Sequence, residues 1–94
     1  MADTGVVEKV LLIQNERGLH ARAASQLVQI AAKFPGEITL AKDGHEVNAK
    51  SIMGVLMLVA PKGSRVTLKA IGAGADVVVA AIARLVDDLF GEGK

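Results

Sequence analysis

The sequence has no cysteine, no tryptophan and no tyrosine, and it has only two phenylalanines among its 94 residues. Without cysteine there is no disulfide framework, no thiolate zinc site and no cysteine nucleophile. The two histidines, His20 and His45, stand far apart along the chain and make a poor zinc set, so we expect neither a metal nor another cofactor. The scarcity of aromatic rings removes the platform on which nucleic-acid-binding sheets stack bases, so no nucleic acid partner is expected.

An excess of charge of one sign is also missing. Eleven Lys plus Arg stand against ten Asp plus Glu, a net charge of +1, which is too balanced to attract nucleic acid or anionic lipid over a distance. No apolar run approaches the roughly 18 residues of a membrane span, and the first residues do not have the pattern of a secretory signal. With 51% hydrophobic residues, we expect one folded domain over residues 1–94, monomeric, cytoplasmic and without membrane insertion.

Strands are predicted at residues 6–14, which are rich in β-branched and aliphatic residues, and at residues 37–42, 45–49 and 65–71, where apolar and polar residues alternate. The middle two flank Asp43 and Gly44, a pair suited to the positive φ angles of a type I′ turn. That turn pairs Lys42 with His45. It also places the apolar side chains of both strands on one face: Ile38, Leu40, Val47 and Ala49. The predicted hairpin is therefore self-consistent.

Two helices are predicted between these strands. Residues 20–34 have one apolar face, so a helix begins at or next to the histidine at position 20, and Pro35 with Gly36 ends it. Ser51 is a suitable N-cap for a short apolar helix over residues 52–58.

A third helix is predicted near the end of the sequence. Its apolar stripe runs over residues 78–89, it is entered through the glycine-rich residues 72–74, and Gly91 closes it. Residues 91–94 are expected to be mobile. The order strand, helix, strand, strand, helix, strand, helix predicts an α+β sandwich with one sheet, helices packed on one face, and the other face in water.

His20 joins a reactive side chain to a predicted helix start. The free backbone N–H groups of Ala21 and Arg22 and the positive end of the helix dipole attract an anion such as phosphate there. The same positive end, together with Arg22, disfavours a charged imidazolium and leaves a ring lone pair that can attack phosphorus. The Arg22 guanidinium would bond strongly to phosphate oxygens. An ordinary helix-starting histidine without function remains an alternative at this point, because the spacing alone is a weak signal.

The short apolar helix is the other candidate for a functional surface. Two turns of helix bury one stripe, so some of its side chains are exposed or meet a partner, and methionine suits an adaptable docking surface. We expect a docking surface next to the reactive histidine that takes in Met53, Val55, Gln26 and Lys50. Ser51 is explained as a plain N-cap, and His45 as a solvated residue beside a turn.

Two linked motifs resemble the HPr family, the histidine-containing phosphocarriers of the bacterial phosphoenolpyruvate-dependent phosphotransferase system. They are Gly-Leu-His-Ala-Arg at residues 18–22 and Lys-Ser-Ile-Met-Gly-Val at residues 50–55, with 31 residues separating His20 from Ser51, and the resemblance covers residues 6–90. It implies an open-faced β-sandwich of four antiparallel strands under three helices. It also implies a phosphoryl carrier that is a protein substrate of other enzymes and not an enzyme itself.

The resemblance also implies roles for particular residues and partners. His20 would take a phosphoryl group on Nδ1 from Enzyme I and pass it to an EIIA domain, with Arg22 as the phosphate partner. Ser51 would be the candidate for regulatory phosphorylation by HPr kinase/phosphorylase. Ala23 departs from the family pattern, which has proline there, and the loss of proline costs about 0.4 to 1 kcal/mol without removing a reactive group. The departure leaves open whether the carrier serves sugar uptake or nitrogen-related regulation.

Three other classes of protein compete with a phosphocarrier. A ferredoxin-like nucleic-acid binder would share the order of elements, but the aromatic platform for bases is missing. A regulatory domain that binds a small metabolite would explain the glycines, but it would not explain a histidine and an arginine at a helix start. A self-contained hydrolase is the weakest alternative, because no Gly-x-Ser-x-Gly sequence occurs.

Overall fold

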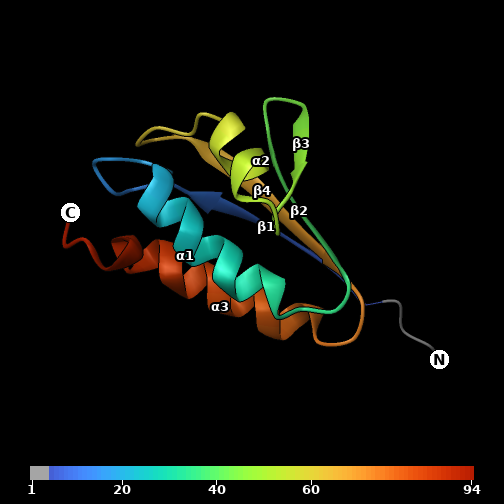
Figure 1. Ribbon diagram of the computed structural model, residues 1–94. Helices are drawn as coiled ribbons and strands as arrows, with labels where there is room; N and C mark the ends of the chain where they lie inside the picture. Colours follow the sequence, from blue (N-terminus) through green and yellow to red (C-terminus); the bar gives the residue numbers. More distant parts are fainter. Residues whose placement is uncertain (1–4) are drawn as a thin grey trace.

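A computed structural model describes residues 5–94 of the protein, which form a four-stranded antiparallel sheet with three α-helices on one face (Figure 1). Along the chain the elements are β1 (Val6–Leu12), α1 (Ala21–Ala32), β2 (Glu37–Lys42), β3 (His45–Asn48), α2 (Ile52–Met57), β4 (Arg65–Ile71) and α3 (Ala75–Asp87), followed by the 3-10 turn η1 (Leu89–Gly91). The strand order in the sheet is β1-β4-β2-β3. The predicted fold class and order of elements are confirmed.

The register of the β2–β3 hairpin is the predicted one. Lys42 pairs with His45, and Leu40 pairs with Val47. Just beyond β3, the N–H of Ala49 donates to the carbonyl of Ile38 at 3.0 Å. The turn residues have φ angles of +52° and +84°, as a type I′ turn requires. The apolar side chains of the hairpin therefore face the helices: Ile38, Leu40 and Ala49 are buried and Val47 is half-buried.

Helices α1 and α3 lie side by side against the sheet (Figure 1). Helix α1 buries the apolar face that its sequence predicts, chiefly Ala23, Ala24, Leu27 and Ala31. Helix α3 buries Ala75, Val78, Val79, Ile82, Ala83 and Val86. Of the predicted stripe, Val78 and Ile82 are buried but Ala81, Leu85 and Leu89 are only half-buried, so the buried face differs from the predicted one. The reason is that α3 packs against β1 and β4 on one side and against α1 on another. No helix within residues 5–94 is long and apolar enough to cross a membrane.

The chain leaves the path of α3 earlier than the sequence predicts. Leu89 and Phe90 have φ angles of +55° and +53°, in the left-handed region, so the helix cannot continue through them. Phe90 is only 1% exposed and anchors the turn in the core. The other predicted bounds differ from the observed ones by one or two residues, which is the usual uncertainty at element ends.

The contrast between the two faces of the sheet gives a first prediction. Val66 is 1% exposed on the helix-covered face, whereas Val10 on the neighbouring strand is 60% exposed. Val66→Ala should lower the free energy of unfolding by about 2 kcal/mol, because two methyl groups are lost and a cavity remains. Val10→Ala should cost less than about 1 kcal/mol. Urea unfolding measures both, and equal losses would show that the outer face of the sheet is also covered.

Candidate functional site

His20 is the N-cap of α1, and its imidazole has a hydrogen-bond partner at each ring nitrogen. Its backbone is extended, with φ −79° and ψ 179°. Nδ1 accepts the backbone N–H of Arg22 at 3.2 Å, and Nε2 bonds to the Oε2 atom of Glu92. A backbone N–H can only donate, so Nδ1 carries a lone pair, and the ring proton is on Nε2, where the carboxylate accepts it. The arrangement presents Nδ1 at the helix N-terminus as a nucleophile.

The loop before His20 is fixed by contacts with the segment between α2 and β4. The N–H of Leu19 donates to the carbonyl of Ala60 at 2.9 Å. Gly18 has a φ of +67°, and a Cβ added there would lie 2.5 Å from that carbonyl oxygen and 2.7 Å from the Cα of Pro61. A side chain at position 18 is therefore excluded by both backbone conformation and space. The glycine of the Gly-Leu-His-Ala-Arg motif allows the loop to approach closely enough to place the histidine.

Asn15 is fully buried beneath this loop and connects it to the C-terminal segment. Its Nδ2 atom donates to the carbonyl of Gly18 at 2.8 Å and to Oε1 of Glu92 at 3.0 Å. Both partners are acceptors, which fixes the orientation of the amide. The Oδ1 atom of Asn15 has no partner within residues 5–94. A continuous set of hydrogen bonds thus runs from Gly18 through Asn15 and Glu92 to His20.

Glu92 is held as a carboxylate. The hydrogen bond to His20 lowers the pKa of Glu92 most, desolvation opposes this change, and the Asn15 bond and the charge of Arg17 lower the pKa further. The side chains of His20 and Glu92 are 23% and 12% exposed. The prediction that residues 91–94 are mobile is therefore wrong for Glu92, which is packed against the site. A possible signal in the sequence was Phe90, an apolar residue that needs a place in the core.

Positive charges surround the same end of the molecule. A shallow hollow beside Glu92 is lined by Glu16, Arg17, Arg22, Gly91, Glu92 and Lys94. Three cations stand there against two carboxylates, so the hollow has a local excess of positive charge that can attract an anion. Arg22 is exposed on the first turn of α1, as predicted, and its backbone N–H points at Nδ1 of His20. The proposed role of the Ala21 and Arg22 N–H groups toward phosphate stays a prediction.

The apolar residues around α2 divide into a buried and an exposed set. Val55 is completely buried, so the prediction that it belongs to a docking surface is wrong. Val55 and Leu58 are three residues apart and face the core together. The exposed set, which we call the α2 surface, consists of Ile52, Met53, Met57 and Val59, and Met53 is 66% exposed. Gln26 and Lys50 are half-buried.

The α2 surface and His20 belong to neighbouring parts of the fold. Helix α1 packs against α2. Val59 directly precedes Ala60, whose carbonyl accepts the N–H of the residue before His20. In Figure 1 the start of α1 and the C-terminal segment lie at the same end of the molecule. The α2 surface and the histidine therefore lie on adjoining elements.

Ser51 is the N-cap of α2, as predicted. Its Oγ accepts the backbone N–H of Gly54 at 3.1 Å, and its own backbone is extended. The side chain is half-buried. This hydrogen bond fully explains a serine at the position, and modification of Ser51 stays a prediction.

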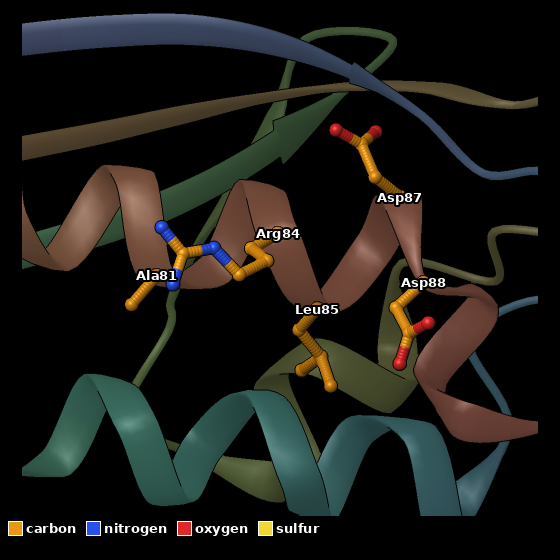
Figure 2. A pocket seen from close by; sticks show the side chains of 5 residues that line it. All are labelled: Ala81, Arg84, Leu85, Asp87 and Asp88. Carbon is orange, nitrogen blue, oxygen red and sulfur yellow. The ribbon is translucent and has the colours of Figure 1, made fainter.

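A second hollow along α3 lacks the chemistry found at His20. It is lined by Ala81, Arg84, Leu85, Asp87 and Asp88, with Leu85 directed toward α1 (Figure 2). It contains no histidine, and its two carboxylates, Asp87 and Asp88, are exposed at the C-terminal end of α3. His45, the other histidine, is exposed at the start of β3 beside the turn, as expected. The reactive chemistry of the described residues is concentrated at His20.

The fold and this site define a small protein that presents one imidazole lone pair at a helix N-terminus beside a group of cations. Comparison with known proteins identifies a family with these features. Residues 7–88 match the family described as PTS HPr component phosphorylation site. The chain therefore belongs to the HPr family, and it is a phosphocarrier protein of the phosphotransferase system and not a catalytic enzyme.

Individual relatives are similar over nearly their whole length. The chain is 40% identical over 89 residues to phosphocarrier protein HPr of Cupriavidus necator, which covers 95% of this chain and 100% of that protein. It is 41% identical over 88 residues to phosphocarrier protein NPr of Shewanella violacea, covering 94% and 97%. A crystal structure of HPr-C-His from Thermoanaerobacter tengcongensis matches with a TM-score of 0.88 at 42% identity, covering 92% of this chain and 97% of that one.

The lowered pKa of Glu92 predicts a pH dependence of stability. The ordinary pKa of the Glu92 carboxyl is 4.5, and its pKa in the folded protein is lower. The stabilisation is therefore fully present above pH 4.5 and is lost as the pH falls through the folded pKa. The difference in free energy of unfolding between wild type and Glu92→Gln should therefore shrink as the pH is lowered below 4.5. Urea unfolding at several pH values tests this. A difference that does not change with pH would contradict the hydrogen bond between Glu92 and His20.

Proposed function

We propose that His20 accepts a phosphoryl group on Nδ1 from phospho-Enzyme I and passes it to an EIIA domain. One observation carries the proposal: Nδ1 of His20 accepts the backbone N–H of Arg22 at the N-terminus of α1, so Nδ1 has a lone pair. In the step, that lone pair forms the new N–P bond while the bond between phosphorus and the donor breaks. The proton stays on Nε2, and the ring gains a positive charge next to the Glu92 carboxylate.

Arg22 is the proposed phosphate partner. When Nδ1 is bonded to phosphorus it no longer accepts the Arg22 N–H, so that N–H and the neighbouring N–H of Ala21 are available to phosphate oxygens. The exposed guanidinium of Arg22 adds a charge-assisted contact. Positive charge at the helix N-terminus favours the transferred group while it is on the carrier.

The α2 surface is the proposed docking site for both Enzyme I and EIIA. Both partners must reach the same histidine, so they share the apolar residues of this surface and are bound in turn. Gln26 and Lys50, half-buried beside it, supply polar contacts at its edge. The carrier acts as a monomer in this proposal, because the α2 surface has to be free for each partner. Its proposed location is the cytoplasm.

Ser51 is the proposed site of regulatory phosphorylation by HPr kinase/phosphorylase. It directly precedes Ile52 and Met53 of the α2 surface, and its Oγ already faces the N-terminus of α2. A phosphate of about −1.5 to −2 charges is tolerated at a helix N-terminus, but it adds repulsion and a desolvation cost for a partner that binds an apolar surface. Modification would therefore weaken docking while the fold is kept.

The physiological branch is sugar uptake or nitrogen-related regulation. Ala23, which replaces the family's proline, is completely buried in the first turn of α1 and carries no reactive group. Relatives called HPr and NPr are 40% and 41% identical to this chain, so overall identity favours neither branch.

The assignment of His20 predicts where an acid-labile phosphoryl group is found. After incubation with Enzyme I, magnesium and phosphoenolpyruvate, intact mass should show one added phosphoryl group that mild acid removes. His20→Ala should abolish the added mass. His45→Ala, the matched loss of an exposed histidine, should leave it unchanged, and equal losses in both variants would contradict the assignment.

The α2 surface predicts a shared effect on both partners. Met53→Glu places a charge where an apolar contact is expected, and it should weaken binding to Enzyme I and to EIIA at least about tenfold, since a hot-spot residue contributes 2 kcal/mol or more. Val77→Glu is the control, because Val77 is 68% exposed on α3. Titration calorimetry with each partner is the measurement. Unchanged affinities for folded Met53→Glu would remove the α2 surface from the proposal.

A further inference from the structure

We infer that Glu92 is a positioning residue for phosphoryl transfer: its carboxylate holds the Nε2–H of His20, so that Nδ1 keeps the lone pair that bonds to phosphorus. The inference extends the proposed function and rests on it. Glu92 lies 72 residues after His20 and outside both sequence motifs, so its role follows from the fold and not from the motifs.

The carboxylate is fixed from behind. Asn15, which is 0% exposed, donates to Oε1 of Glu92 at 3.0 Å and leaves Oε2 for the imidazole. Asn15 is itself held by its bond to the Gly18 carbonyl at 2.8 Å, two residues before the histidine. One hydrogen bond therefore joins the carboxylate to the ring, and two more, through Asn15, join the carboxylate to the loop that carries the histidine.

The C-terminal turn brings Glu92 to this point. Phe90 is buried, and Leu89 and Phe90 have positive φ angles that redirect the chain away from α3. The N–H groups of Gly91 and Glu92 donate to the carbonyls of Asp88 and Leu89, each at 2.9 Å. Non-glycine residues with positive φ are uncommon and cost energy, so a turn with two in succession is held by the surrounding structure.

The negative charge of Glu92 repels a phosphate bound at this site. A carboxylate there therefore needs another role that offsets this repulsion. The charged groups facing it are Arg17, Arg22, Lys94 and Glu16, which line the same hollow. The compensating role follows from the chemistry of the ring. When Nδ1 forms its bond to phosphorus, the imidazole becomes positively charged, and the Glu92 carboxylate stabilises the proton that remains on Nε2. The effect is greatest after the bond has begun to form.

The first experiment observes the ring directly, without phosphoryl transfer. Nitrogen-15 NMR of the full chain, labelled in histidine, reports the tautomer of His20 and the exchange of its Nε2–H with water. In wild type the Nε2–H tautomer should dominate and the proton should exchange slowly. In Glu92→Gln the exchange should become at least tenfold faster, and the Nδ1–H tautomer should become detectable. The same tautomer and the same exchange rate in both proteins would overturn the inference.

Two further variants separate position from charge. Asp88→Asn removes one exposed carboxylate from the same end of the chain and should behave as wild type. Glu92→Asp keeps the charge but is one methylene shorter, so it should behave like Glu92→Gln if the contact is what matters. A Glu92→Asp protein with wild-type ring signals would show that charge alone is sufficient, and it would overturn the positioning role. Glu92→Asp also keeps the test available if Glu92→Gln folds poorly.

The second experiment measures transfer from phospho-Enzyme I. Glu92→Gln should lower kcat about tenfold and leave KM within twofold of wild type, because the effect belongs to the reacting ring and not to docking. Asp88→Asn should change neither by more than twofold. A change confined to KM would overturn the inference. Absence of phosphorylation in wild type would instead refute the proposed function, while the NMR result would still decide whether Glu92 holds the ring.

Discussion

The site depends on one close backbone contact, between the loop that precedes α1 and the segment that follows α2. The N–H of Leu19 donates to the Ala60 carbonyl, and Gly18 approaches so closely that no Cβ fits. This contact sets the point at which α1 begins, and so it places His20 at the N-cap. It also ties the α2 surface to the reactive ring, because Val59 and Ala60 are consecutive. His20 and the α2 surface are therefore positioned by the same few backbone atoms.

The environment of the imidazole is made from both ends of the chain. One ring nitrogen is directed by a backbone N–H of α1 and the other by Glu92. Asn15 links Glu92 to the loop before α1, although its Oδ1 has no partner within the part of the chain that the structure describes. A buried unpaired polar atom costs about 1 to 3 kcal/mol. A polar residue retained at that cost is better explained by the orientation of the carboxylate than by stability alone.

The sequence predicts the local features of the fold well and the long-range ones poorly. Hairpin register follows from period-two alternation and a two-residue turn, both of which lie within about ten residues. The N-cap position of His20 follows from the motif and the helix pattern. Which side of α2 is buried could not be read from an uninterrupted apolar run, so Val55 was placed on the wrong side. Glu92 was missed because its position depends on the positive φ angles before it and on the burial of Phe90, neither of which has a periodic signal.

The mixed charges around His20 suit a protein that must release what it accepts. Arg17, Arg22 and Lys94 line the hollow beside Glu92, and a site made only of cations and helix N–H groups would bind a phosphoryl group strongly. Tight binding in the carrier would raise the barrier to the next transfer, because only interactions that strengthen in the transition state accelerate a step. A carboxylate beside the cations reduces the attraction to the bound phosphate, and it simultaneously stabilises the charged ring. One side chain can therefore weaken the hold on the phosphoryl group and keep the ring in its transferring orientation.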